Sequence, residues 1–255
     1  MFKRLCFLFA VVAVVLAAGA AQPKHIVFMI GEDEYKTWET LPEFVAKDLK
    51  PRGYRITIIQ ANEADKNNFP GLTAALTDAD LLFLSVRRRT PLKEQLDAVR
   101  AHLAAGKPLV GIRTACHAFA LRPKDKLADA EKLAAWQEFD PEVLGGHYTN
   151  HYGNGPKTAV AIAPGAEASP ILKGITISAL NGNGSLYKVS PLVTDATPLL
   201  LGTIPDKPAE PLAWTRLYGA KHARIFNTTL GHPDDFQSAE FRRLLVNAVA
   251  WAVGK

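Results

Sequence analysis

One segment of the chain gathers most of the side chains that could do chemistry. Residues 145–155 carry two histidines, two tyrosines and two asparagines between pairs of glycines. Glycine lets the backbone take φ > 0 or approach a ligand closely, and imidazole and phenol groups bind metals, sugars or protons. The segment is therefore predicted to be a functional loop, although rings that only cap the core fit the same pattern.

Three more polar clusters follow apolar runs that are predicted to be strands. They are residues 32–35, 87–89 and 113–117. Ligands of parallel sheets bind beyond the carboxyl ends of the strands, so we expect the clusters to converge at one edge of a sheet. The alternatives are acids at a solvated helix start and arginines in a solvated loop.

Cys116 is the one candidate for a nucleophile that follows a predicted strand. A helix start would lower its thiol pKa, and His117 is its neighbour. However, Arg113 occupies the nucleophile's place in the strand-to-helix elbow pattern that begins at Gly111. Neighbours on a helix also face different directions, so Cys116 and His117 are not expected to pair. We predict that Cys116 is a small buried residue.

The histidines leave two hypotheses open. His147 and His151 are four residues apart, which on a helix would place both rings on one face as zinc ligands, but the glycines and Asn150 favour irregular backbone. His117 and His232 are further candidates. Either a divalent metal, zinc by preference, is held by His147, His151 and His232, or the histidines bind or protonate a substrate without metal.

The N-terminus has the pattern of a secretory signal peptide over residues 1–21. A basic start precedes an apolar run from Leu5 to Ala18 and a small-residue exit, and the run is too short to prefer spanning a bilayer. We expect a secreted or periplasmic protein whose residues 22–255 form a single domain; a retained amphiphilic anchor is the alternative. With Cys116 as the one remaining cysteine, no intramolecular disulfide can form.

Composition argues against several classes of partner. The chain has 30 Lys and Arg against 25 Asp and Glu, and no basic stripe carries the interleaved aromatic residues typical of nucleic-acid binding. No segment after the leader is apolar enough to cross a membrane. We expect a small-molecule ligand, no nucleic acid, no membrane contact in the mature form and no nucleotide cofactor. Nothing in the sequence indicates an oligomeric state.

The apolar pattern predicts an α/β fold. Continuous apolar strands that alternate with helices indicate a parallel sheet covered on both faces, and the second half of the chain is richer in β segments. Trp214 lies in one of these β segments, as a core residue or a sugar-stacking platform. The predicted strands are 25–30, 54–60, 80–86, 108–112, 157–163, 185–189, 198–204, 212–218 and 224–229, and the predicted helices include 91–105, 129–139 and 238–253.

Five motifs carry a family resemblance. They are Gly31-x-x-Glu34-Tyr35, Gly111-Ile112-Arg113-Thr114-x-x-His117-Ala118-Phe119, Gly145-Gly146-His147-Tyr148-x-x-His151, Ala213-Trp214-Thr215-Arg216-x-Tyr218-Gly219 and Thr229-Leu230-Gly231-His232-Pro233-x-Asp235-Phe236. Together they resemble the ThuA-like, or trehalose-utilisation, family. The resemblance implies a flavodoxin-like (class I glutamine amidotransferase-like) parallel sheet flanked by helices, without the cysteine nucleophile of those enzymes. It also implies sugar catabolism, including routes through 3-keto-glycosides, and a divalent metal in some members. The leader and the triple arginine depart from a cytoplasmic trehalose enzyme, so the substrate is not carried over.

Two functions are consistent with these features. The first is an enzyme outside the cytoplasm that acts on a glycoside or 3-keto-glycoside by proton abstraction with elimination, hydrolysis or isomerisation. The second is a non-catalytic sugar-binding protein; a cysteine-dependent amidotransferase is opposed by Arg113 at the elbow. For the enzyme, His147 or His151 is base or metal ligand, Glu34 is the alternative base, and Arg113 and His232 stabilise an oxyanion. The predicted substrate-binding residues are Tyr35, His117, Tyr148, Asn154, Trp214 and Asp235, and we expect His147 and His151 to lie within a ligand's width of Arg113 and His232.

Overall fold

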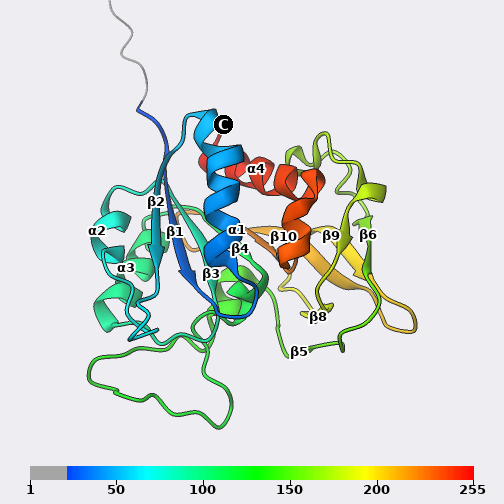
Figure 1. Cartoon of the computed structure of the whole chain (residues 1–255). Helices are drawn as coiled ribbons and strands as arrows, with labels where there is room; N and C mark the ends of the chain where they lie inside the picture. The colour runs from blue at the N-terminus through cyan, green and yellow to red at the C-terminus, as the bar shows by residue number, and fades with distance from the viewer. Residues whose placement is uncertain (1–21) are drawn as a thin grey trace, which may run out of the picture.

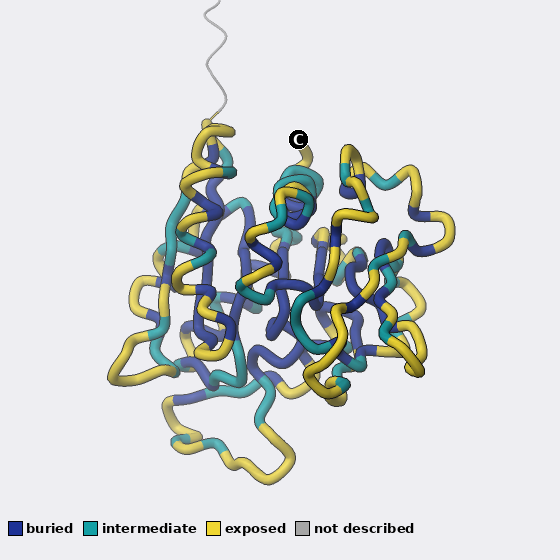
Figure 2. Tube along the Cα trace, turned by 45° about the vertical axis from the view of Figure 1, so that its right-hand side comes forward, coloured by how far each residue is buried: buried dark blue, intermediate teal, exposed yellow. Residues whose placement is uncertain are grey.

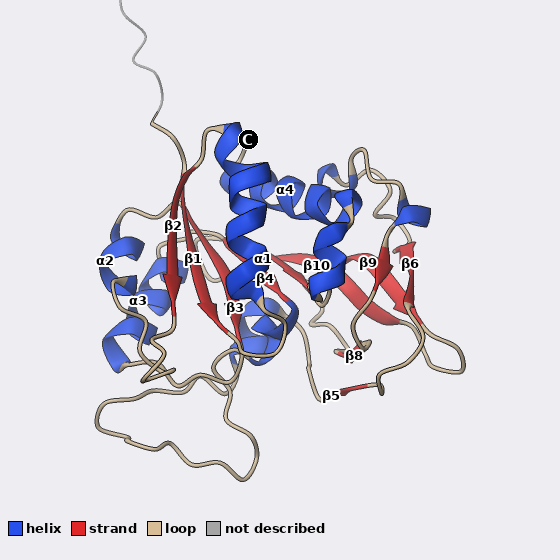
Figure 3. Ribbon diagram, viewed as in Figure 1, coloured by secondary structure: helices blue, strands red, loops and turns tan. Residues whose placement is uncertain are grey.

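The computed structural model describes residues 22–255, so the predicted signal peptide lies outside the described residues. A mixed nine-stranded sheet in the order β2-β1-β3-β4-β11-β10-β9-β6-β7 runs through them, and β5 and β8 form a separate two-stranded sheet (Figure 3). The strands are β1 (His25–Gly31), β2 (Arg55–Gln60), β3 (Leu81–Val86), β4 (Leu109–Ile112), β5 (Asn150–His151), β6 (Thr158–Ile162), β7 (Asn181–Gly182), β8 (Tyr187–Lys188), β9 (Thr197–Thr203), β10 (Glu210–Tyr218) and β11 (Ala223–Thr228).

The sheet changes from parallel to antiparallel at β11. Strands β2, β1, β3, β4 and β11 are mutually parallel, whereas β10, β9, β6 and β7 follow in antiparallel pairs. Strands β1, β3 and β4 are buried along their whole length, as the continuous apolar runs predict. The predicted α/β fold is confirmed, and the β-rich second half extends the parallel sheet sideways.

Helices cover both faces of the parallel part. The side chains of α1 and α4 pack with Phe28, Phe83 and Val110 on one face, and those of α2 and α3 pack with Met29 and Leu84 on the other. Figure 2 shows the buried strands between these layers. The helices are α1 (Thr37–Phe44), α2 (Leu72–Thr77), α3 (Lys93–Ala104) and α4 (Ala239–Val253), with short π or 3-10 turns η1 (Val45–Leu49), η2 (Lys50–Arg52), η3 (Arg113–His117), η4 (Asp140–Leu144), η5 (Pro170–Leu172), η6 (Ile177–Ala179) and η7 (Pro233–Gln237).

One predicted helix is wrong. Residues 129–138 form turns and irregular structure, drawn in Figure 1 as part of the long green loop, and Phe139 directly precedes the turn η4. Their backbone amides are used elsewhere: that of Ala134 donates to the carbonyl of Pro91, and that of Trp136 donates to the carbonyl of Phe119. Helical spacing of apolar side chains was therefore misleading, because these long-range hydrogen bonds compete with a local helix.

The segment 145–155 is tied across the strand ends by β5 and β8. The amide of His147 donates to the carbonyl of Val189, and that of Tyr152 donates to the carbonyl of Leu186. In Figure 1 both short strands lie at the end of the molecule toward which the β1 arrow points. Within residues 22–255, none of the helices combines the length and hydrophobicity that a membrane span needs.

Candidate functional site

The polar clusters predicted to converge do meet at one sheet edge. The amide of Arg87, after β3, donates to the carbonyl of Gly31 at the end of β1, and that of Arg88 donates to the carbonyl of His117 after β4. The Arg87 Nε atom lies 2.7 Å from Oε2 of Glu34. Side chains from strand ends far apart in sequence therefore form one surface, as expected from a parallel sheet.

Three of the five non-glycine residues with a positive φ in residues 22–255 lie at this edge. Lys36, Arg88 and Arg113 each have a positive φ, of 52°, 50° and 47° respectively. Residues with a Cβ rarely adopt the left-handed region, and strained residues of this kind cluster at functional sites. Arg113 thus keeps the sharp turn that places a nucleophile in elbow-type enzymes while carrying a guanidinium instead.

The Arg113 guanidinium forms the buried floor of the site. It lies between two aromatic rings, 4.6 Å from the ring centre of Tyr35 and 4.0 Å from that of Tyr187. Its Nη1 donates to the carbonyls of Ser185 and Thr229, and its Nη2 donates to the hydroxyls of Tyr35 and Ser185. Both terminal nitrogens are thereby occupied by protein groups, so the guanidinium organises the floor and supplies charge from beneath.

Gly184 is required by this arrangement. A Cβ at this position would lie 2.6 Å from Nη2 of Arg113, so only glycine lets the chain pass so close to the guanidinium. Burial by itself would lower the pKa of Arg113, but interactions with Tyr187, Tyr35 and Asp235 outweigh it and raise the pKa. The guanidinium is therefore a permanent cation.

A polar cavity of about 410 Å³ opens above this floor. Among the residues that line it, hydroxyl, amide, imidazole, ammonium and carboxylate groups are all present, which suits a ligand that both donates and accepts hydrogen bonds. The lining residues are Glu34, Tyr35, Lys36, Arg113, Asn154, Gly155, Asn183, Gly184, Ser185, His232 and Pro233.

Asp235 connects two segments that form the wall of the cavity, the one that contains Asn183 and the one that contains His232. Its Oδ2 accepts from the amides of Gly231 and His232, and its Oδ1 accepts from the amide and side chain of Asn183. These protein donors occupy both carboxylate oxygens, and the residue is 2% exposed, so Asp235 positions the wall and does not hold a ligand hydroxyl as the sequence suggested. Nδ1 of His232 accepts from the amide of Asp234 at 3.3 Å, so a neutral His232 ring carries its proton on Nε2.

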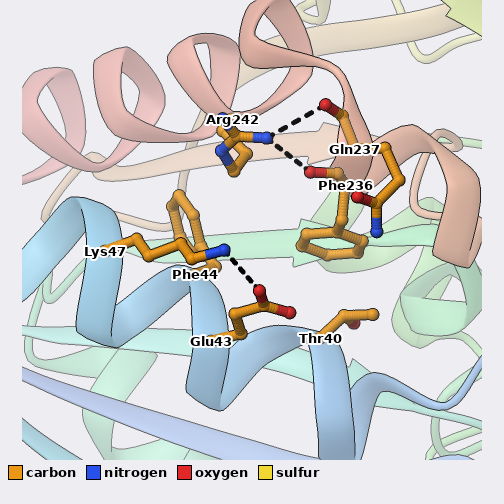
Figure 4. A pocket seen from close by; sticks show the side chains of 7 residues that line it. All are labelled: Thr40, Glu43, Phe44, Lys47, Phe236, Gln237 and Arg242. Carbon is orange, nitrogen blue, oxygen red and sulfur yellow. Dashed lines mark hydrogen bonds and ion pairs between the residues drawn. The ribbon is translucent and has the colours of Figure 1, made fainter.

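The turn η7 that follows His232 is fixed by packing beneath it. Nη1 of Arg242 donates to the carbonyls of Phe236 and Gln237, as Figure 4 shows. The ring of Phe236 lies 6.4 Å from that of Phe44, which belongs to α1. Helices α1 and α4 therefore both set the position of His232.

Glu32, part of the cluster 32–35, has an organising role that the sequence did not predict. Its Oε2 accepts from the amides of Glu34 and Tyr35, and its Oε1 accepts from the amide and hydroxyl of Thr37. The carboxylate thus folds the loop after β1 so that Tyr35 faces Arg113. An acid placed just before a helix start is the signal that could have identified this role.

The loop histidines do not line the cavity. His147 and His151 are exposed, and Nδ1 of His151 lies 2.7 Å from the carbonyl of Tyr152 in the same loop. The loop contributes Asn154 and Gly155 to the cavity wall instead. In the part of the chain that the structure describes, no group of three or more His, Cys, Asp or Glu residues is placed to hold a metal ion. His147, His151 and His232 therefore do not form a metal site in these residues.

The buried His117 ring and the half-buried Tyr148 ring form a layer beside the floor. Their rings stack at 4.4 Å. Burial, together with Arg88 and the neighbouring guanidinium groups, lowers the pKa of His117 well below its ordinary value, and burial raises the pKa of Tyr148 to about 12. Neither residue lines the cavity. Both rings instead pack against the ring of Tyr187, which lies against the Arg113 guanidinium. Trp214 likewise lies in the core, where its Nε1 donates to the carbonyl of Leu144 at 2.7 Å.

Cys116 is buried, as predicted, but it does contact its neighbour. Its Sγ lies 3.4 Å from Nδ1 of His117, and it donates to the carbonyl of Arg113. The expectation that Cys116 and His117 would not pair is wrong, because residues 113–117 form a 3-10 turn rather than the α-helix assumed. Burial raises the thiol pKa well above its ordinary value, so the protonated thiol is a poor nucleophile.

Comparison with known proteins identifies the family. A family model described as ThuA, trehalose utilisation, matches residues 27–252. The chain belongs to the ThuA family. The family description points to carbohydrate utilisation. The motif residues Glu34, Tyr35, Arg113 and His232 of this chain lie together at the cavity. No protein with a curated description matches.

Solved structures similar to this ThuA chain support the fold. A ThuA-like protein from Bacteroides uniformis ATCC 8492 has 19% identity and a TM-score of 0.66, with 93% of this chain and 94% of that chain covered. A ThuA-like protein from Parabacteroides merdae ATCC 43184 has 15% identity and a TM-score of 0.60, with 91% of each chain covered. A β-galactosidase from Rahnella sp. R3 has 14% identity and a TM-score of 0.56; the match covers 90% of this chain but 31% of the galactosidase. At these identities the likeness extends to the fold alone.

Proposed function

We propose that this ThuA-family protein is a carbohydrate-catabolism enzyme that acts on a 3-keto-glycoside by proton abstraction and elimination. The observation that carries the proposal is the polar cavity in which Glu34, Tyr35 and His232 face one space above the buried cation of Arg113. A sugar is rich in hydroxyl groups, which both donate and accept hydrogen bonds. The residues that line the cavity include hydrogen-bond donors and hydrogen-bond acceptors. The leader over residues 1–21 supports the further proposal that the protein acts in the periplasm or outside the cell.

Glu34 is the proposed base. Among the residues that line the cavity, it contributes the one carboxylate, and its side chain is 47% exposed beside Arg87. A keto group at C3 acidifies the proton on C2, so a carboxylate can remove it and leave an enolate whose charge develops on the C3 oxygen. His232 donates its Nε2 proton to that oxygen as a hydrogen bond, and the Arg113 cation stabilises the charge from beneath. Collapse of the enolate expels the aglycone from C1.

The test is turnover of defined substrates. Purified protein is incubated with 3-keto-trehalose and with 3-keto-glucosides in D₂O, and release of the aglycone and deuterium exchange at C2 are followed by NMR. We expect both, with a loss of at least about 100-fold in Glu34→Gln. Glu43→Gln is the matched control, because Glu43 is an exposed acid on α1 that pairs with Lys47 and does not line the cavity. A wild-type protein that neither releases an aglycone nor exchanges the C2 proton would exclude this function.

The same assay addresses the metal hypothesis. A chelator is added in parallel, and His147→Ala and His151→Ala are assayed without it. The proposal expects activity to persist in each case, since neither histidine lines the cavity. If the chelator abolishes activity, and His147→Ala and His151→Ala each abolish it as well, the zinc hypothesis is restored.

A further inference from the structure

The hydroxyl of Tyr35 is surrounded by hydrogen-bond donors. Nη2 of Arg113 donates to it at 3.1 Å, and the hydroxyl of Tyr187 donates to it at 3.4 Å. Burial raises the pKa of Tyr187 well above its ordinary value, so that hydroxyl keeps its proton and remains a donor. A phenol oxygen has two acceptor positions and one hydrogen. With both acceptor positions occupied, the Tyr35 hydrogen is left for a group outside this network, and Tyr35 lines the cavity.

The same contacts stabilise Tyr35 after it has lost its proton. A phenolate at this position would keep the charge-assisted hydrogen bond from Nη2 of Arg113 and the hydrogen bond from Tyr187. The guanidinium also packs over the Tyr35 ring, and both side chains are at least nine-tenths buried. Water therefore screens this pair weakly, and the cation is in place before any charge forms.

From this geometry we infer that Tyr35 is the general acid that protonates the departing aglycone oxygen. The inference rests on the proposed function and assigns Tyr35 a proton-transfer role rather than substrate binding alone. Glu34 takes the proton from C2, and the C–H electron pair forms a C2–C3 double bond while the carbonyl pair moves to the C3 oxygen. When that carbonyl re-forms, a C1–C2 double bond appears, the C1–O bond breaks, and the aglycone oxygen takes the Tyr35 proton. The proton held by Glu34 then returns to Tyr35 through water, so no oxidant or reductant is consumed.

His232 is less suited to this step. Its Nδ1 accepts from the amide N–H of Asp234 at 3.3 Å and lies 3.6 Å from Oδ2 of the same residue, so a neutral ring carries its one hydrogen on Nε2. A neutral imidazole in this setting holds its Nε2 proton and donates a hydrogen bond without releasing the proton. Tyr35 and His232 therefore have different roles. Tyr35 protonates the leaving aglycone oxygen, and His232 donates a hydrogen bond to the C3 oxygen.

The experiment compares Tyr35→Phe with wild type on two 3-keto-glucosides, one with an alkyl aglycone and one with a nitrophenyl aglycone. For the alkyl substrate we expect kcat to fall at least about 100-fold with KM changed by less than about threefold. Nitrophenolate leaves without protonation, so the loss for the nitrophenyl substrate should stay below about tenfold. Tyr218→Phe is the matched control, because it removes a hydroxyl that donates to Glu142 away from the cavity; its rates should equal those of wild type.

The outcomes separate the two proposals. Wild-type turnover with equal losses for both aglycones in Tyr35→Phe, or with no loss, overturns the acid role and leaves the proposed function standing. A role in binding alone would raise KM for both substrates without this dependence on the aglycone. A wild-type protein that cleaves neither substrate overturns the proposed function and the acid role together, since no leaving oxygen is then protonated.

Discussion

Replacing Arg113 by leucine is expected to lower the free energy of unfolding by about 3 to 5 kcal/mol and to reduce activity about 1000-fold. The stability loss follows because the two terminal nitrogens donate to the carbonyls of Ser185 and Thr229 and to two hydroxyls. Leucine leaves these buried acceptors without partners. Under the proposed mechanism activity falls because the cation that would stabilise the charge on the C3 oxygen is gone.

Two further variants make the Arg113 result specific. Arg113→Lys keeps the positive charge but lacks the planar guanidinium. We therefore expect its free energy of unfolding, measured in urea, to lie between those of wild type and Arg113→Leu. Arg100→Leu is the matched control: Arg100 also lies over an aromatic ring, that of Trp136, but its side chain is 39% exposed. It should cost less than about 1 kcal/mol. Equal unfolding free energies for Arg113→Leu and wild type would show that the guanidinium does not organise the floor.

Asp140 should make the protein less stable as the pH rises from about 4 to about 7. Burial raises the pKa of Asp140 from 3.8 to about 7, although the amide of Tyr148 donates to its Oδ2. In this window the unfolded chain ionises Asp140 and the folded protein keeps it protonated. The unfolded state thus binds fewer protons, and each pH unit lowers the free energy of unfolding by about 1.4 kcal/mol. The contribution is complete near pH 7, where the folded protein also ionises.

Urea unfolding at several pH values checks this expectation. Asp140→Asn is nearly the same shape and cannot ionise, so its stability should lack the fall and exceed that of wild type at pH 8. Asp97→Asn is the control, since the Asp97 side chain is 66% exposed, and it should follow the wild-type curve. Parallel curves for wild type and Asp140→Asn would contradict a buried, protonated Asp140. Because Asp140 holds the amide of Tyr148, the variant also tests how the loop 145–155 is anchored.

Local patterns were sufficient to predict the parallel half of the fold. Continuous apolar runs such as those of β1 and β3 need no distant partner to be recognised, and the chain after each strand must emerge at the same edge. This is why the clusters 32–35, 87–89 and 113–117 could be predicted to converge, and Glu34, Tyr35 and Arg113 of these clusters line the cavity.

Which residues line the cavity, and which only support it, depends on contacts between segments that are distant in the sequence. The pairing of β5 with β8 places His151 opposite Tyr187 and leaves the imidazole exposed, and nothing within residues 145–155 encodes that partner. Asp235 resembles a ligand-binding acid until the amides that occupy it are known. Asn183 and Ser185 were missed, although their glycine-rich surroundings resemble those of the loop that was chosen.

The central claim is that the cavity above Arg113 is where the sugar binds, and a crystal structure of Glu34→Gln soaked with a 3-keto-glucoside tests it most directly. We predict that the sugar lies within hydrogen-bond distance of the Tyr35 hydroxyl, the Ser185 hydroxyl and Nε2 of His232. A sugar bound instead on the exposed face beside His147 and His151, with the cavity unfilled, would contradict it.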